Sequence, residues 1–377
     1  MFHKTAKQGQ HIVNDSARLL NMVGIITASF IVFYILHIWA DFIVPFIIAL
    51  LLSFWILGLS NLFKRFRIPW PIAMILSLTC YIWIFWLIWN IISVNIQELQ
   101  PKIPEYQVRL GEIISSSFTY FWVQEPATVR EYFSNLNFIS YFTDFASAIA
   151  NIFSKIWIIM FYVLFILLEH RYFSSKLKAM IPNESQENKV LSALHQIKTD
   201  VGSYFFIKTW VSLVTASLSY IVLMFFWVDF ALFWAFLIFS FNFIPTIGSV
   251  IAVFFPVALA LIQFDSYYSV LFLFSWLTGV QVLMWNIIEP KFVWNKLNLS
   301  PLLIILSLWF WGYIWGIPGM ILSVPIMVIL NIILSKFQST KPIAILFSEK
   351  WDLKMNIDET EKNRKELVKK LKKRLFM

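Results

Sequence analysis

The chain has 377 residues, of which 59% are hydrophobic and only 14% charged, and its formal net charge is +9. A soluble protein has too little polar side chain to cover that much apolar surface, so this composition excludes a soluble domain and favours lipid as the solvent. We attribute the positive charge to basic loops on the cytoplasmic side of a membrane rather than to a nucleic-acid partner.

Three apolar runs open the chain, at 22–40, 42–60 and 70–94, and we expect a membrane span in each. The first run is about 19 residues long, which matches a span of roughly 20 better than the apolar part of a signal peptide, at about 7–15. We therefore predict that it anchors the chain and that residues 1–94 form an N-terminal unit of three spans.

Residues 95–148 are more polar and contain Pro101, Pro104 and Pro126. No apolar run within them is long enough to cross a bilayer, so we predict an extracytoplasmic (periplasmic) helical segment. A fourth span is expected at 149–169.

Residues 170–203 form a second segment that is too polar to span. Their apolar side chains recur at helical spacing and share one stripe, which is typical of an amphipathic helix on the cytoplasmic surface. The stripe consists of Val190, Leu194, Ile197 and Val201, and it continues to Tyr204, the first residue of the next segment.

The transport core is expected at 204–335, where two apolar segments are too long for one crossing. Segment 230–264 would measure about 52 Å as a straight helix and segment 297–335 roughly 58 Å, against about 30 Å of hydrocarbon. Both are interrupted near the middle, so we predict two helical hairpins, either re-entrant or crossing twice. The interruptions are Pro245, Gly248, Gly316, Pro318 and Gly319.

Lys and Arg residues gather in alternate loops and in the basic tail at 336–377. The positive-inside rule then places both termini in the cytoplasm and residues 95–148 outside. The predicted fold class is an all-α, polytopic integral membrane protein with about six full spans plus two Pro/Gly-broken helical hairpins.

A broken helix in lipid leaves backbone amides and carbonyls unpaired, at a cost of several kcal/mol each. Such breaks persist only where protein or a wet cavity covers them, so two interrupted apolar segments in one chain indicate a transport site near the membrane midplane. The alternative is a pair of ordinary hairpins with tight turns at the membrane surface.

The first break contains Asn242, Pro245, Thr246 and Gly248. Asn242 either caps the backbone that the proline ring frees or contacts a polar solute. Gly248 permits a tight turn or the close approach of another backbone. Lys208, at the start of the fifth span, is expected to snorkel to the interface.

A second group of polar residues ends the run at 266–288. Gln281, Trp285 and Glu289 are four residues apart and are predicted to share one helix face, with Asn286 beside it. Glu289 either pairs with Lys291 at headgroup level or binds a cation or proton in a cavity. The predicted substrate-binding residues are Asn242, Pro245, Thr246, Gly248, Gln281, Asn286, Glu289, Gly316 and Gly319.

Three stretches resemble the autoinducer-2 exporter-like (AI-2E) transporter family: FNFIPTIGSVIAVFFP, QVLMWNIIEPKF and LSPLLIILSLWFWGYIWGIPGMILSVP. They are similar to its N-x-I-P-x-x-G turn, its Q…N…P block, its Pro-led apolar segment and its G-x-x-G stretch, in the same order. The resemblance covers residues 180–335 well.

The resemblance implies a multi-pass carrier of the bacterial inner membrane that exports a small polar or signalling molecule of the kind used in quorum sensing. It also implies a homo-oligomer, for example a pentamer. Other members are linked to sodium or proton exchange, so a cation–proton antiporter is the alternative function. A non-transporting scaffold or channel-like protein is a second alternative.

Enzyme chemistry has no support in the sequence. There is no HExxH, GxSxG, P-loop or GxGxxG motif, and the five histidines lack the spacing of metal ligands. We therefore predict no enzyme activity, no cofactor and no metal; the expected partners are a small polar solute and the lipid bilayer.

Overall fold

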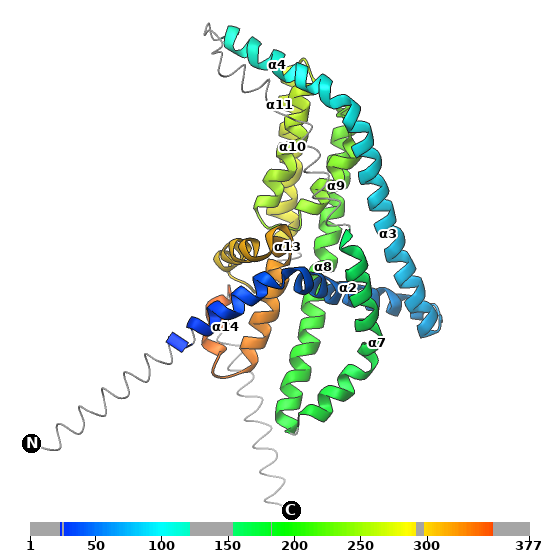
Figure 1. The fold of residues 1–377 in the computed structure, drawn as a ribbon, viewed down its shortest axis with the longest axis vertical. Coiled ribbons are helices and arrows are strands. Elements are labelled where there is room, and N and C mark those ends of the chain that lie inside the picture. Colours follow the sequence, from blue (N-terminus) through cyan, green and yellow to red (C-terminus); the bar gives the residue numbers. More distant parts are fainter. Residues whose placement is uncertain (1–22, 25, 121–153, 182, 292–297, 350–377) are drawn as a thin grey trace, which may run out of the picture.

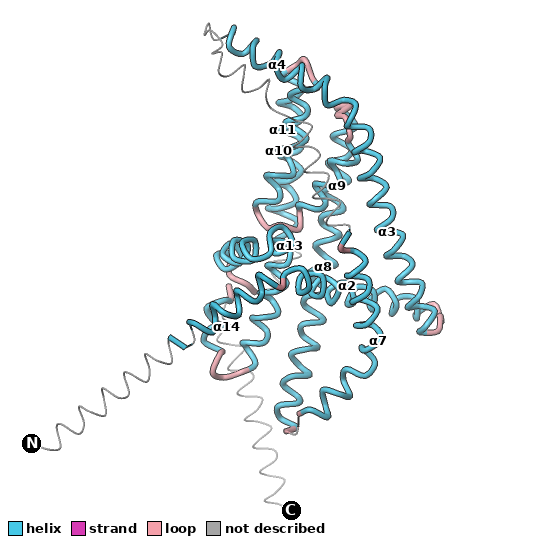
Figure 2. The backbone as a smooth tube through the Cα atoms, viewed as in Figure 1, coloured by secondary structure: helices cyan, strands magenta, loops and turns pink. Residues whose placement is uncertain are grey.

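The structure is a computed structural model that describes residues 23–24, 26–120, 154–181, 183–291 and 298–349. Within these ranges every regular element is helical and no strand occurs (Figure 2). In this described part of the chain, five helices are long and apolar enough to cross a membrane, and four shorter apolar helices accompany them. The predicted all-α, polytopic membrane fold is therefore confirmed. Residues 1–21, 121–148 and 350–377, which belong to three of the predicted segments, lie outside the described part.

A helix over Ile26–Ile38 precedes the labelled elements. These elements are, in chain order, α2 (Ala40–Arg65), α3 (Trp70–Leu99), η1 (Gln100–Lys102), α4 (Ile103–Tyr120), α7 (Ile156–Met180), α8 (Glu184–Phe225), α9 (Ala231–Phe241), α10 (Ile247–Gln263), α11 (Tyr267–Leu283), the π-helix η2 (Met284–Ile288), α13 (Pro301–Lys336) and α14 (Lys341–Phe347).

The helix α8 has 42 residues, about 63 Å at 1.5 Å per residue, twice the roughly 30 Å of a bilayer core. The amphipathic stretch that ends at residue 203 therefore continues without a break into the expected fifth span. Its interior holds no proline, and a lone Gly202 costs a helix only about 1 kcal/mol. In Figure 1, α4 and the N-terminal part of α8 lie at opposite ends of the molecule.

Three buried apolar clusters hold the helices together, and each is stabilised by removing apolar surface from solvent, at about 25 cal/mol per Å². The first joins the N-terminal half of α8 to α2 and α13. The second joins the C-terminal half of α8 to α9, α10 and α11. The third joins α2, α3 and α7. The helix α8 is thus shared by two clusters and connects them.

The first predicted hairpin is present as α9 and α10, joined by a turn at residues 242–246. Thr246 has φ 59° at the end of this turn. A Cβ atom on Gly248 would lie 1.9 Å from the carbonyl oxygen of Phe241, so only glycine fits. That carbonyl, which the ring of Pro245 frees from its helical partner, accepts the amide of Ile244 at 2.8 Å and is thus paired within the turn.

The second predicted hairpin is the kinked helix α13. Its backbone leaves the helical region at Gly316, with φ 65° and ψ −144°. A Cβ on Gly319 would lie 1.9 Å from the carbonyl oxygen of Trp311, which repeats the close approach seen in the first hairpin. Both breaks therefore use a glycine to admit a carbonyl from the preceding helix, and the prediction of two broken hairpins is confirmed.

Candidate functional site

A row of buried polar side chains runs along α8, and we call it the polar stripe. It consists of Lys208, Ser212, Thr215 and Ser219, with exposed fractions of 3% or less. Their spacing of four, three and four residues keeps them on one face of the helix. The stripe lies between the α8 residues of the first apolar cluster, which include Tyr204, and those of the second, which include Leu223.

Lys208 forms an ion pair with Glu289, which directly follows η2. The exposed fractions of the two side chains are 4% and 6%. Taking two opposite charges out of water costs several kcal/mol per ion, and the cost is offset only when the partners stay together. Snorkelling of Lys208, and a headgroup-level partner for Glu289, are therefore both wrong, because each group finds its counter-charge inside the bundle.

Asn242 connects the first break to the stripe. Its side-chain amide donates to the hydroxyls of Ser212 and Thr215, at 3.2 Å and 3.4 Å. The side chain is buried, so these hydrogen bonds replace the contacts it would make with water. Asn242 therefore does not cap the backbone that Pro245 frees; it fixes the turn against α8.

Gln281 lies on the buried face of α11, one turn beyond Leu277. Because Lys208 meets Glu289, while Leu223 clusters with Leu273 and Leu277, the helices α8 and α11 run antiparallel. Gln281 precedes Glu289 by eight residues, which is about 12 Å of helix. Because Glu289 meets Lys208 and the helices are antiparallel, Gln281 lies level with the part of the polar stripe that holds Thr215 and Ser219.

Two buried polar atoms at this level have no hydrogen-bond partner among the described residues: Nε2 of Gln281 and Oγ of Ser219. Buried polar groups are paired in the great majority of cases, because leaving one unpaired costs about 1–3 kcal/mol. An unpaired amide donor and an unpaired hydroxyl at a similar level of the bundle are suited to a guest that offers oxygen acceptors.

The structure places the other predicted site residues as follows. Pro245 is buried in the turn and Gly248 is buried in the first turn of α10. Thr246 is half-buried, and its hydroxyl donates to the carbonyl of Pro245 at 2.7 Å. Asn286 is exposed. Trp285 is exposed as well, so it does not share a face with Gln281 and Glu289.

The π-helix η2 explains the exposure of Trp285. A π-helix repeats after five residues rather than four and inserts one extra residue into the turn. The buried positions are accordingly Gln281, Met284 and Glu289, and the equal spacing of four that the sequence suggested is lost. The wider turn brings the carboxylate of Glu289 round to Lys208.

Gly316 and Gly319 belong to a different environment. The hydrogen bonds beside the second break lead to the N-terminal helix: Trp315 Nε1 donates to the carbonyl of Leu36 and His37 Nδ1 bonds the carbonyl of Ile314, both at 2.9 Å. The structure therefore groups Asn242, Gln281 and Glu289 along α8, and it covers the second break with protein on another side.

The residues that sequence reasoning missed are the three hydroxyls of the stripe and the role of Lys208. The sequence does contain a pattern that could have indicated them, because polar residues at spacings of four, three and four within an apolar helix lie on one face. What the sequence did not provide was the partner of that face, since Lys208 and Glu289 are 81 residues apart.

A buried polar row, a buried ion pair and a broken helix inside an apolar bundle are characteristic of membrane transport proteins. The pattern of the AI-2E family transporter matches residues 23–339. The chain therefore belongs to the AI-2E transporter family and is a polytopic membrane transporter.

Individual relatives agree with this assignment. The chain is 31% identical over 306 residues to a protein of Borreliella burgdorferi named "Putative transport protein", with 80% of this chain and 83% of the relative covered. It is 29% identical over 321 residues to the AI-2 transport protein TqsA of Escherichia coli K12, with 82% and 90% covered. A Haemophilus influenzae protein, also named "Putative transport protein", is 28% identical over 327 residues, with 84% and 92% covered.

Proposed function

We propose that this transporter exports a small polar solute of the autoinducer-2 kind, a role in quorum sensing, and that the solute passes the polar stripe of α8. The observation that carries the proposal is the hydrogen-bonded link between the first break, at Asn242, and the hydroxyls of Ser212 and Thr215. The relative TqsA is named as an AI-2 transport protein, which supports the choice of solute.

The groups around the stripe support a neutral, oxygen-rich solute. The unpaired donor of Gln281 requires an acceptor, and the hydroxyls of the stripe both donate and accept. Lys208 and Glu289 already neutralise each other. A solute that carries its own charge would have to displace one of them, at the cost of an unpaired buried ion.

Transport of labelled autoinducer-2 from loaded proteoliposomes tests the proposal. We expect Asn242→Ala and Gln281→Ala each to lower the flux at least tenfold, because each removes a hydrogen-bonding group from the path. The matched control is Asn286→Ala, an exposed amide on the same segment as Gln281, which we expect to change flux less than twofold. Unchanged flux in both Asn242→Ala and Gln281→Ala would refute the assigned site.

The second candidate function is cation–proton antiport, and the buried carboxylate of Glu289 is the observation that favours it. The adjacent ammonium of Lys208 repels a metal ion, so Lys208 would have to leave before a cation binds. A pH-sensitive dye inside the same proteoliposomes separates the two functions. Antiport predicts a cation-driven dye response that Glu289→Gln abolishes, whereas export predicts none.

We further propose a bacterial inner-membrane location with both termini in the cytoplasm. The positions of α4 and of the N-terminal part of α8, at opposite ends of the molecule, support the predicted extracytoplasmic and cytoplasmic sides (Figure 1). A cysteine in the C-terminal tail that reacts with an impermeant thiol reagent added outside intact cells would contradict this orientation.

A homo-oligomer, for example a pentamer, is the proposed assembly. The small residues Ser275 and Gly279 lie four apart on an exposed face of α11, and such pairs let a second helix approach closely in a membrane. Native mass spectrometry from lipid nanodiscs gives the subunit number, and a monomer alone would contradict the proposal.

A further inference from the structure

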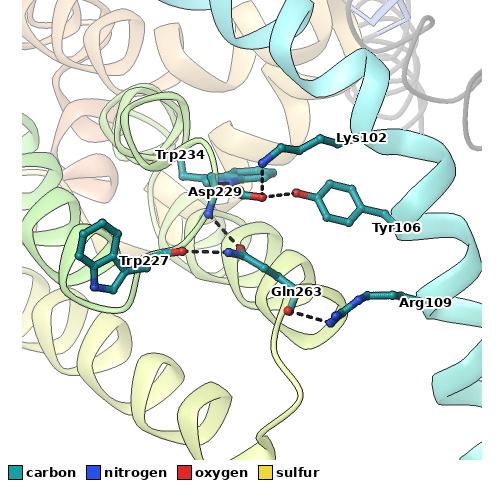
Figure 3. Close-up of polar contacts among 7 residues, drawn as sticks. All are labelled: Lys102, Tyr106, Arg109, Trp227, Asp229, Trp234 and Gln263. Atoms are coloured by element: carbon teal, nitrogen blue, oxygen red, sulfur yellow. Dashed lines mark hydrogen bonds and ion pairs between the residues drawn. The ribbon is translucent and has the colours of Figure 1, made fainter.

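Three side chains of the segment η1–α4 project from one face toward the first hairpin (Figure 3). Lys102, Tyr106 and Arg109 are spaced by four and three residues, which is one face of a helix. Lys102 Nζ and Tyr106 Oη both bond to Oδ2 of Asp229, at 2.7 Å and 2.6 Å. The Nζ atom of Lys102 also lies 5.3 Å from the ring centre of Phe230, the N-cap residue of α9.

Arg109 contacts the other end of the same hairpin. Its Nη1 donates to the carbonyl of Gln263 at 3.0 Å and to Oδ1 of Asp265 at 3.1 Å. Asp229 precedes α9, and Gln263 ends α10. One face of the η1–α4 segment therefore holds both ends of the hairpin, at the end away from its break.

Gln263 closes this open end of the hairpin. Its side chain accepts the amide of Asp229 at 2.9 Å and donates to the carbonyl of Trp227 at 2.8 Å. Trp234 Nε1 adds a bond of 3.1 Å to the carbonyl of Asp229. These hydrogen bonds join the two ends of the hairpin, so we expect the two ends to move together.

The interfaces on the two sides of this hairpin differ in chemistry. Toward α8 and α11 the hairpin packs through the second apolar cluster, and no residue of that cluster belongs to η1 or α4 in the part of the chain that the structure describes. Toward η1–α4 the hydrogen bonds and ion pairs described above are partly exposed, with side-chain exposures of 42% for Lys102 and 29% for Asp229. Exposed ion pairs contribute about 0–1 kcal/mol each.

We propose that Lys102, Tyr106 and Arg109 form a latch that holds the hairpin α9–α10 in the present conformation and opens in each transport cycle. A polar, partly solvated interface can open and re-form at little cost, whereas an apolar one resists separation. The hairpin, α8 and α11 then move together relative to η1–α4. The proposal rests on the transport function but not on the identity of the solute or of the residues that bind it.

Locking the latch with a covalent link tests the proposal. Arg109→Cys with Asp265→Cys, in a background without the single native cysteine (Cys80→Ser), removes the bonds of Arg109 but leaves the bonds of Lys102 and Tyr106 to Asp229 and the side-chain bonds of Gln263 in place. A short bifunctional methanethiosulfonate reagent then bridges the two thiols through disulfides that dithiothreitol reverses. We expect bridging to lower autoinducer-2 flux at least tenfold and reduction to restore it. The monofunctional reagent adds bulk to the same variant without a bridge. It should leave the flux within about twofold of that of the unmodified variant.

The result that would overturn the latch is an unchanged flux after complete bridging, since the η1–α4 segment and the hairpin would then move as one unit. If the wild-type protein does not transport autoinducer-2, it is the proposed function that is in question. Spin labels on the same two cysteines then test the latch without flux. We expect two distance populations in lipid, one with the latch closed and one with it open, and a single fixed distance would contradict the latch.

Discussion

We expect that replacing Lys208 or Glu289 alone destabilises the protein far more than replacing both together. Each single change, Lys208→Met or Glu289→Gln, leaves one charge buried without its partner, which costs about 3–5 kcal/mol in measured cases. The double replacement leaves no buried charge, so we expect its unfolding free energy to lie within about 1 kcal/mol of the wild type. Unfolding in mixed micelles with increasing dodecyl sulfate, followed by tryptophan fluorescence, measures the difference.

Lys291→Met is the matched control for this series, because Lys291 is exposed and lies two residues from Glu289. We expect that change to be neutral. A double variant as unstable as the single ones, or single variants as stable as the wild type, would show that the two groups do not depend on each other. A stable double variant also separates folding from function, because its flux reports on the pair without a folding defect.

The replacement Gly248→Ala is expected to prevent the first hairpin from closing. The new methyl group would lie 1.9 Å from the backbone carbonyl oxygen of Phe241 and 3.1 Å from Cβ of Ile244. Neither atom can move by a side-chain rotation, so the turn itself must open. Overpacking of a buried site typically costs about 1–3 kcal/mol and occasionally more, and a backbone clash belongs at the upper end. The hydrogen bonds of Asn242 to α8 would be lost with the turn.

The control for Gly248→Ala is Gly202→Ala, in the interior of α8, where an added Cβ has no neighbour within 4 Å. Alanine is favoured over glycine inside a helix by roughly 1 kcal/mol, so this variant should be slightly more stable than the wild type. The same unfolding titration and the amount of folded protein in the membrane measure both variants. A Gly248→Ala protein as stable as Gly202→Ala would contradict the close approach in the turn.

The two hairpins could be predicted because their length conflicts with the bilayer. An uncharged segment such as 230–264 is too long for one crossing, and Pro245 and Gly248 lie where the excess has to be turned back. The role of Gly248 also followed from its chemistry, since a residue without Cβ admits a neighbouring carbonyl. Length and backbone chemistry are local properties, and a sequence displays them directly.

The polar stripe could not be predicted in the same way, because it depends on which faces meet. Ser and Thr hydroxyls bond back to their own helix in many membrane proteins, as Thr215 also does with the carbonyl of Val211. The pairing of Lys208 with Glu289 joins two helices that are distant in sequence, and η2 changes the register between them. Neither the contact nor the π-turn has a local signal that distinguishes it from an ordinary helix.

The most direct test of the proposed solute path is whether water reaches the polar stripe of α8 during transport. In this structure the side chains of the stripe are buried, so a solute can pass them only if the stripe becomes hydrated. Ser212→Cys and Leu223→Cys, both fully buried on α8, are compared in a Cys80→Ser background with a small water-soluble methanethiosulfonate reagent during transport. We predict that Ser212→Cys reacts, that autoinducer-2 slows the reaction, and that Leu223→Cys in the second apolar cluster stays unmodified. A Ser212→Cys protein as unreactive as Leu223→Cys would contradict the proposed solute path.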